Sequence, residues 1–281
     1  GAGLSQQVER LFSSALARNH FRQFISQWLE LDGIPTPNTT VLSQVNKAFL
    51  REDAIAELVD LVEHLIFDQN AGPKELFTST LGKPNTSELA AVYGLSGPQL
   101  GFVSLGAKRQ GILTRAAFLL SQSEEPSAIR RGVKTQFQIL CNRLPPPPPS
   151  APTVIIPVNP HGVVTSRMAL ESATASPMCT SCHGQINPFG IALHRFDGLG
   201  QFRTTEMAMN YDTGVKVSTP LDVRIQLSIQ GRDKGFVNDE VEYSRMLSDE
   251  ATVAQCIAGQ WLSFGAGEDL RKSCAAENLG N

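Results

Sequence analysis

The apolar residues in the first half of the chain recur at spacings of three and four, which is the period of amphipathic helices. One such stripe runs through residues 8–29 and is ended by Pro35 and Pro37. A second helix is expected over residues 51–67, with Glu52 and Asp53 in its first turn, where they complement the helix dipole. The same period predicts further helices over 74–81, 86–93, 109–121 and 128–142.

A run of five prolines interrupts this pattern, in the stretch LPPPPPSAP at residues 144–152. Prolines lack the backbone donor and favour a stiff polyproline II rod. We interpret the run as a semi-rigid strut between two parts of the chain, and a docking site for a proline-binding partner is the alternative. With the run as a strut, the predicted organisation is a helical domain over 1–144, a linker over 145–152 and a second domain over 153–281.

The second part of the chain has a mixed pattern. Residues 153–158 are expected to be extended, and residues 167–173 to be helical. Residues 211–229 alternate with period two around turn residues, which predicts a short β-hairpin or a pair of short strands. The helical period returns over 239–264. The predicted fold class is therefore mainly α, with a helical N-terminal part and a small helical second domain that carries the hairpin.

Bulk composition excludes several classes of protein. Among 281 residues, 41% are hydrophobic and 18% charged, as in ordinary globular proteins. Residues 1–144 hold 14 basic against 13 acidic side chains, and residues 145–281 hold 10 against 14. Neither half is basic enough for a nucleic-acid surface, so no nucleic-acid partner is expected. No apolar run approaches the roughly 20 residues of a membrane span, and none is expected in this chain.

The most specific chemical signal is the run Cys179-Thr180-Ser181-Cys182-His183. With five Cys and five His in the chain, about 0.002 chance occurrences of Cys-x-x-Cys-His are expected, so coincidence is a poor explanation of this attachment pattern for c-type haem. Two thiols on one helical turn can each form a thioether with a haem vinyl group, and the adjacent imidazole can bind the iron. We therefore predict one covalent haem c and its iron, held by Cys179, Cys182 and His183, so that the second domain, 153–281, is haem-binding.

The motif has two other possible uses, a structural zinc site and a redox dithiol. A structural zinc site needs two further ligands, usually a second close pair, and Cys256 and Cys274 lie 18 residues apart. A redox dithiol is expected beside a strand in a βαβ unit, and nothing of that kind precedes Cys179. Both alternatives are weaker than haem c.

The segment that follows the motif, CHGQINPFGIALHRFDGLGQFRTTE, resembles the haem-motif domain of planctomycete and myxobacterial-type multidomain cytochrome c-like proteins, whose domains are of unknown function. The chain departs from that pattern at Asn187, where Asp is usual, and at His194, where Glu is usual. The matching residues are Cys179, Cys182, His183, Pro188, Gly190, Ala192, Leu193, Phe196, Asp197, Gly200 and Arg203.

The resemblance continues through residues 110–149, 253–267 and 9–32, and so covers nearly the whole chain. It implies that residue 1 is not the native start and that the chain is the C-terminal part of a longer polypeptide or complex. Although Asp197 and Arg203 match the family pattern, we expect them to serve the geometry of the loop beside the haem rather than acid–base catalysis. Arg195 or Arg203 are candidates to pair with haem propionates, because they follow the motif closely in sequence.

His183 supplies one axial ligand, and the other axial position is open. Met246, which lies 63 residues further on in a predicted helix, is the leading candidate, although a Met in an apolar stripe is more often a core residue. Other distal candidates, or an unfilled position, remain alternatives: Met207, Met209, His194, His161 and Met168.

Three cysteines lie outside the motif. Because haem c matures in oxidising compartments, we expect a disulfide between Cys256 and Cys274. Pairing of Cys141 with either of them, or buried thiols, are the alternatives.

Three function classes follow from these patterns. The leading hypothesis is a c-type cytochrome module that transfers electrons with an unidentified redox partner protein, in the periplasm or at the cell surface. The second is a haem enzyme of peroxidase or oxygenase type with an open distal position, and no catalytic residue is assigned for it. The third is a structural or interaction module that the haem stabilises. Occupancy of the distal position separates the first two.

Overall fold

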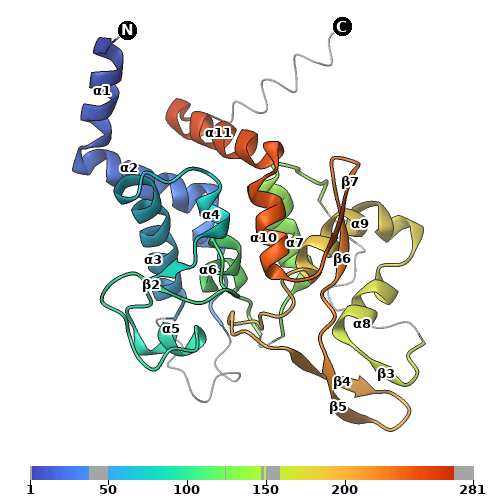
Figure 1. Ribbon diagram of the computed structural model, residues 1–281. Helices are drawn as coiled ribbons and strands as arrows, with labels where there is room; N and C mark the ends of the chain where they lie inside the picture. Colours follow the sequence, from blue (N-terminus) through green and yellow to red (C-terminus); the bar gives the residue numbers. More distant parts are fainter. Residues whose placement is uncertain (1, 38–49, 124, 147–148, 150–158, 269–281) are drawn as a thin grey trace, which may run out of the picture.

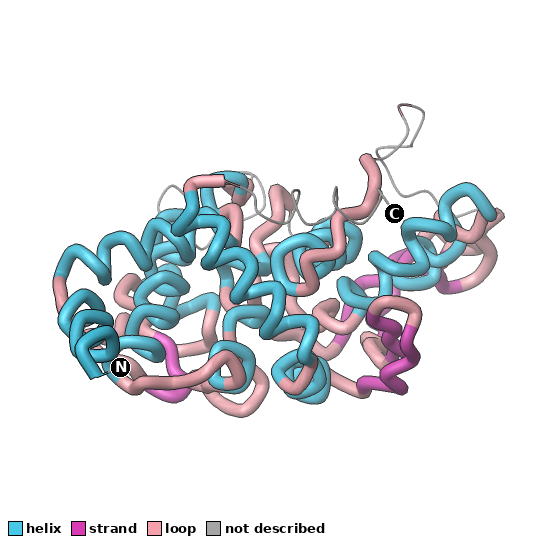
Figure 2. The backbone as a smooth tube through the Cα atoms, turned by 90° about the horizontal axis from the view of Figure 1, so that it is seen from above, coloured by secondary structure: helices cyan, strands magenta, loops and turns pink. Residues whose placement is uncertain are grey.

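A computed structural model describes residues 2–37, 50–123, 125–146, 149 and 159–268. Helices of the first half lie on one side of the molecule, and the larger strands lie at the opposite end (Figures 1 and 2). The elements before the proline run are α1 Ala2–Phe12, α2 Ala15–Trp28, η1 Leu31–Gly33, α3 Leu50–Glu63, η3 His64–Asp68, α4 Glu75–Thr78, β1 Leu81–Gly82, α5 Ser87–Val92, β2 Val103–Ser104, η4 Ile112–Thr114, α6 Ala116–Leu119, α7 Ala128–Lys134 and η5 Thr135–Ile139.

The elements after the proline run alternate between helices and strands. They are β3 Val163–Val164, α8 Ser166–Ala173, α9 Pro177–Ile191, β4 Thr205–Asn210, β5 Val215–Pro220, β6 Ile225–Ile229, β7 Arg232–Val237, α10 Glu240–Ser248 and α11 Ala251–Ala266. None of the helices among the described residues combines the length and the hydropathy that crossing a bilayer requires.

The prediction of a mainly α fold is wrong. About 51% of the structure is helical and 13% is strand, and the described residues form three small antiparallel sheets, β1–β2, β3–β4–β5 and β6–β7. Two of the strands, β4 (TEMAMN) and β7 (RDKGFV), carry few β-branched residues, so their sequences gave little strand signal. They form strands because their backbones hydrogen-bond to the neighbouring strands β5 and β6. The fold is therefore mixed α and β.

Turn residues set these pairings. Gln230 and Gly231, between β6 and β7, both have positive φ, at 52° and 74°, as a tight hairpin turn of matching twist requires. The alternating segment over 211–229 therefore forms two short strands that belong to different sheets, rather than one hairpin. β5 pairs backward with β4, and β6 pairs forward with β7.

Several predicted helices are confirmed, and in two of them the N-cap side chain accepts a hydrogen bond from an amide of the first turn. Ser127 begins α7 by accepting from the Arg130 amide, and Thr165 begins α8 by accepting from the Met168 amide. The helix predicted over 109–121 is wrong, because only η4 and α6 form there. Gly111 has a φ of 58°, and a Cβ at this residue would lie 2.3 Å from the backbone of Phe77, so no helix continues through it. Arg115 is extended, with φ −79° and ψ 147°, and separates η4 from α6.

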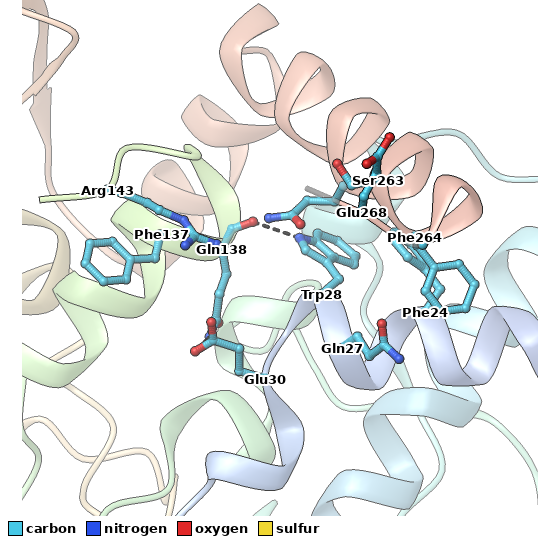
Figure 3. Close-up of a pocket in the computed structure, with 12 residues that line it drawn as sticks. Phe24, Gln27, Trp28, Glu30, Phe137, Gln138, Arg143, Ser263, Phe264 and Glu268 are labelled. Carbon is cyan, nitrogen blue, oxygen red and sulfur yellow. Dashed lines mark hydrogen bonds between the residues drawn. The ribbon is translucent and has the colours of Figure 1, made fainter. Parts of the chain in front are cut away.

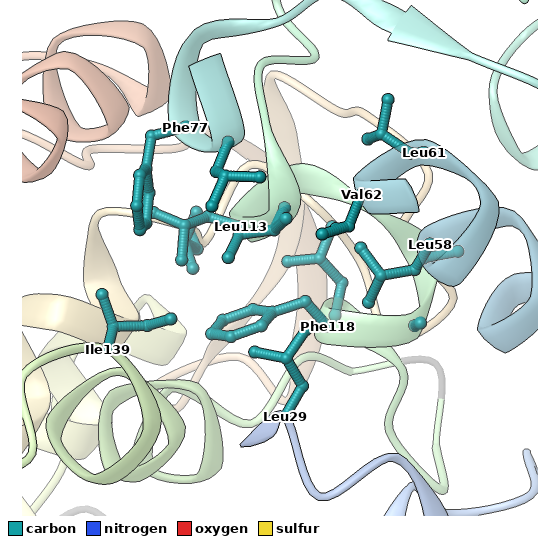
Figure 4. Close-up of a cluster of buried hydrophobic side chains, with 14 of the residues drawn as sticks. Leu29, Leu58, Leu61, Val62, Phe77, Leu113, Phe118 and Ile139 are labelled. Carbon is teal, nitrogen blue, oxygen red and sulfur yellow. The ribbon is translucent and has the colours of Figure 1, made fainter. Parts of the chain in front are cut away.

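One buried apolar cluster contains residues from both sides of the proline run. Pro147 and Pro148 of that run, residues 150–152 of the predicted linker and the segment 153–158 predicted as extended lie outside the described residues. The division into two domains stays a prediction. Figure 4 shows the part of the cluster between α2, α3, α4, η4, α6 and η5, with Leu29, Leu58, Leu61, Val62, Phe77, Leu113, Phe118 and Ile139 labelled.

α7 and α9 cross at very short range. An added Cβ at Gly132 on α7 would lie 2.1 Å from the carbonyl oxygen of Ile186, and one at Gly190 on α9 would lie 1.8 Å from that of Ala128. Glycine on each helix therefore lets the two backbones meet. The contact buries the C-terminal half of α9, where Ile186 and Phe189 are almost fully covered.

Arg131 of α7 holds the chain that leaves α9. Its fully buried guanidinium donates to the carbonyls of Leu119, Leu193 at 3.0 Å, Phe196 at 2.6 Å and Asp197. Burial lowers the pKa of Arg131 to about 9, so the side chain is still a cation at neutral pH. A buried cation satisfied by carbonyls fixes these loops firmly, since removing it leaves their oxygens unpaired.

The structure pairs Cys141, directly after η5, with Cys256 of α11, whose Cα atoms lie 5.4 Å apart. The expected Cys256–Cys274 disulfide is therefore wrong, and the alternative in which Cys141 pairs with Cys256 is observed. The partner of Cys256 is 115 residues away in sequence, so only the packing of α11 near η5 brings the two thiols together. Cys274 lies outside the described residues.

Replacing either crossing glycine should destabilise the protein. Gly132→Ala and Gly190→Ala force backbone atoms apart, so we expect each to lower the free energy of unfolding by about 1–3 kcal/mol in urea titrations. Gly184→Ala is the matched control on α9, because its Cβ would meet nothing closer than 3.9 Å. Alanine is also the better helix former, so this control should be neutral or stabilising. Equal losses in all three variants would contradict the close crossing.

The disulfide gives a second prediction. A Cys141→Ser, Cys256→Ser double variant should lose about 2–4 kcal/mol of unfolding free energy, because the cross-link restricts a long loop of the unfolded chain. Cys274→Ser is the control and should leave the stability unchanged. Non-reducing peptide mapping should link positions 141 and 256, and a peptide linking 256 with 274 would disprove the pairing.

Candidate functional site

The motif lies on the exposed half of α9. Ser176 is the N-cap, and Pro177 occupies the first turn, where its missing donor costs nothing. Cys179 and Cys182 follow at a spacing of three, which places them on the same side of the helix. Both are partly exposed free thiols. The neighbouring side chain of Met178 is 74% exposed, so this end of α9 is open to solvent.

The buried half of α9 supports His183 from behind. The Nδ1 of His183 lies 3.0 Å from Oδ1 of Asn187, one turn further along the helix. Asn187 in turn donates from Nδ2 to the hydroxyl of Thr174 at 3.0 Å, and Thr174 donates to the Leu170 carbonyl at 2.8 Å. The other ring nitrogen of His183, Nε2, makes no hydrogen bond to the described residues.

This donor set fits a covalent haem c. Two free thiols lie about one turn apart, beside an imidazole whose Nε2 is available. The residue after His183 is Gly184, which has no side chain to cover this part of the helix. The described residues contain no group of three or more His, Cys, Asp or Glu side chains placed to hold a metal ion. A closed zinc site at the motif would thus need ligands from elsewhere.

The distal candidates are widely separated, and the choice among them stays a prediction. Met246 of α10 is half-buried and packs against the main apolar cluster. Met207 and Met209 of β4 alternate with the buried Glu206 and Ala208, so they belong to the outer face of that strand. Two further candidates are exposed: His161, which pairs with Asp212 at 3.6 Å, and Met168 of α8.

His194 is buried beyond the C-terminal end of α9. At 1.5 Å of rise per residue, the helix alone separates its last residue, Ile191, from His183 by about 12 Å. The Nε2 of His194 lies 3.2 Å from Oγ of Ser166. Burial, followed by the nearby cations Arg131, Arg203 and Arg167, lowers the pKa of His194 to about 3, so the ring is neutral at physiological pH.

Ser166, His194 and Glu206 lie together but do not form a nucleophilic triad. The Ser166 hydroxyl donates its only proton to Glu206, which also accepts from the Ser166 amide at 3.2 Å. Ser166 must therefore accept from His194 Nε2–H. A catalytic base would instead accept the serine proton. The cluster ties the start of α8 to β4 and to the loop after α9.

The loop residues have structural partners. Oδ1 of Asp197 accepts from the amides of Leu199 at 2.9 Å and Gln201 at 2.8 Å, so this side chain shapes the turn. Burial raises the pKa of Asp197. Arg195 pairs with Glu240 at 3.4 Å and Arg203 with Glu125 at 3.6 Å. The propionate role suggested for the two arginines stays a prediction.

A pocket of about 490 Å³ lies away from the motif, and the sequence did not indicate it (Figure 3). It opens between the end of α2, η5 and the end of α11, and Trp28 Nε1 donates across its wall to the Gln138 carbonyl at 2.7 Å. The aromatic residues of α2 and α11 were visible as helical stripes, but their proximity depends on tertiary packing. The lining residues are Phe24, Gln27, Trp28, Glu30, Phe137, Gln138, Arg143, Gln260, Ser263, Phe264, Gly267 and Glu268.

The burial of His194 predicts an acid-sensitive step in stability. Its folded pKa of about 3 lies below the unfolded value of about 6.5, so the unfolded chain binds the proton first as the pH falls between these values. Each pH unit in that window should remove up to about 1.4 kcal/mol of unfolding free energy.

The variant His194→Gln keeps an N–H donor for Ser166 but cannot titrate. In urea titrations at pH 7, 6, 5 and 4, it should lose less stability on acidification than the parent chain. Identical pH slopes for the two proteins would show that His194 is not held neutral.

Comparison with known families adds two matches. Residues 109–206 match the family described as PSCyt3, a protein of unknown function (DUF1588), and residues 1–95 match the family described as PSD4, a protein of unknown function (DUF1592). Both domains are typical of planctomycete and myxobacterial multidomain cytochrome-like proteins, which confirms the resemblance at the level of these domains. No curated protein and no solved structure matches the chain.

Proposed function

We propose that this chain is a c-type cytochrome module that transfers electrons through one covalent haem. Cys179 and Cys182 would hold the haem through thioethers, and His183 would bind its iron through Nε2. The bound haem would supply one-electron redox chemistry. The observation that carries the proposal is the exposed turn with two free thiols and an imidazole whose Nδ1 is already bonded to Asn187.

The position of the motif supports transfer to a partner protein. It lies on an exposed helical turn, where a haem edge can approach another protein, while the buried half of α9 is fixed against α7. The Cys141–Cys256 disulfide supports a location in an oxidising compartment, the periplasm or the cell surface. The crossing glycines hold the buried half of α9 against α7, directly after the motif, which suits a carrier that must reorganise little.

A haem enzyme with an open distal position is the second candidate. Met246 packs on the core and His194 is hydrogen-bonded to Ser166, so two of the proposed distal ligands are engaged elsewhere. An iron without a strong sixth ligand could bind a small molecule.

The decisive measurement is the intact mass and the reduced absorption spectrum of protein produced with a c-type maturation system. We expect the mass of one added haem and the sharp spectrum of a c-type haem. Cys179→Ala and Cys182→Ala should each lose one thioether, and the double variant should carry no covalent haem. Cys141→Ser is the matched control and should keep the haem. An unmodified mass in correctly matured protein would refute the assignment.

Ligand binding then separates the two candidates. No spectral change with carbon monoxide, cyanide or peroxide is expected for the carrier, whereas rapid binding would favour the enzyme. A haem that affects only thermal stability would instead indicate a structural module.

A further inference from the structure

The hydrogen bonds behind His183 have only one possible direction. The carbonyl of Leu170 can only accept, so the Thr174 hydroxyl, 2.8 Å away, must give it its single proton. The same hydroxyl oxygen must therefore accept its next hydrogen bond. Its neighbour at 3.0 Å is the side-chain amide of Asn187, which consequently presents Nδ2 to Thr174.

The direction of these hydrogen bonds determines the tautomer of the His183 imidazole. With its Nδ2 on Thr174, Asn187 turns Oδ1 toward His183, and an amide oxygen can only accept. His183 must donate from Nδ1, which leaves the lone pair on Nε2. Asn187 and Thr174 are 7% and 8% exposed, so water competes little with either bond.

We propose that Asn187 is a positioning residue for the axial histidine. It holds His183 in the tautomer that can bind iron, and as a neutral amide it keeps the imidazole less electron-rich than a carboxylate would. The inference rests on the proposed haem function. Thr174 belongs to the same device, because it prevents the amide of Asn187 from rotating.

The chemistry of the acceptor sets the direction of the effect. A carboxylate at position 187 would accept a stronger, charge-assisted hydrogen bond from His183 Nδ1–H. The ligating nitrogen would become more basic, which stabilises the ferric state. Asn187→Asp should therefore lower the reduction potential, and Asn187→Leu, which has no acceptor, should raise it.

The first arm of the test is redox titration of the haem-loaded chain. For Asn187→Asp we expect about a tenfold rise in the ratio of oxidised to reduced protein at a fixed ambient potential, equivalent to about 59 mV for one electron. Gln185→Ala is the matched control on α9, because Gln185 bonds Ser181 and Asn142 rather than His183. It should leave the midpoint unchanged. Equal midpoints for all variants would overturn the proposal.

The second arm does not need the haem. Nitrogen NMR of the full chain produced without haem should show His183 as the Nδ1–H tautomer, and Asn187→Leu should abolish that preference. If the chain never acquires covalent haem, the proposed function fails while this arm still decides the role of Asn187.

Two variants at Thr174 test the same proposal in case the Asn187 variants do not fold. Thr174→Val removes the hydroxyl that holds the amide and should weaken the tautomer preference, whereas Thr174→Ser keeps the hydroxyl and should restore it. A wild-type tautomer in Thr174→Val and Asn187→Leu alike would overturn the proposal.

Discussion

The close crossing of α7 and α9 is the constraint on which the rest of the second half depends. Gly132 and Gly190 let the two backbones approach until no Cβ fits between them. The contact fixes the buried half of α9 and leaves the half with the two thiols exposed. One helix thereby combines an anchor and an open chemical face, and the anchor determines where the motif points.

Arg131 extends this anchor to the loop after α9. Its guanidinium is shared among carbonyls from α6 and the loop, so two segments distant in sequence depend on one buried cation. The same charge helps keep His194 neutral. Loop geometry, the neutral state of His194 and the attachment of α8 through Ser166 therefore share this buried cation. Replacing one of these groups should disturb the others.

The arrangement around His183 follows a similar principle at smaller scale. The partly exposed imidazole of His183 is oriented by the buried side chains of Asn187 and Thr174, and these hydrogen bonds end at the Leu170 carbonyl. Such support lets the ring face solvent without losing its orientation. It also means that residues outside the motif contribute to any redox property of the site.

Much of this could be predicted from local sequence. The helical period located α3 and α8, local caps explain the start of α8, and the spacing of Cys179, Cys182 and His183 gave the candidate chemistry. The sequence also showed that Asn187 stands where the family pattern that the chain resembles usually has Asp. These features depend on residues within one or two turns of each other, so a single segment carries enough information.

Tertiary structure decided the remainder, because the partners are distant in sequence. Gly111, packed against Phe77, and the extended Arg115 interrupt the helix expected over 109–121. β4 and β7 are strands because they pair with neighbouring strands. Cys141 and Cys256 form a disulfide although they are 115 residues apart in sequence. The sequence by itself determined helices such as α3 and α8 and the spacing of Cys179, Cys182 and His183. The fold decided which face of α9 is exposed, because only packing brings the glycines of two helices together.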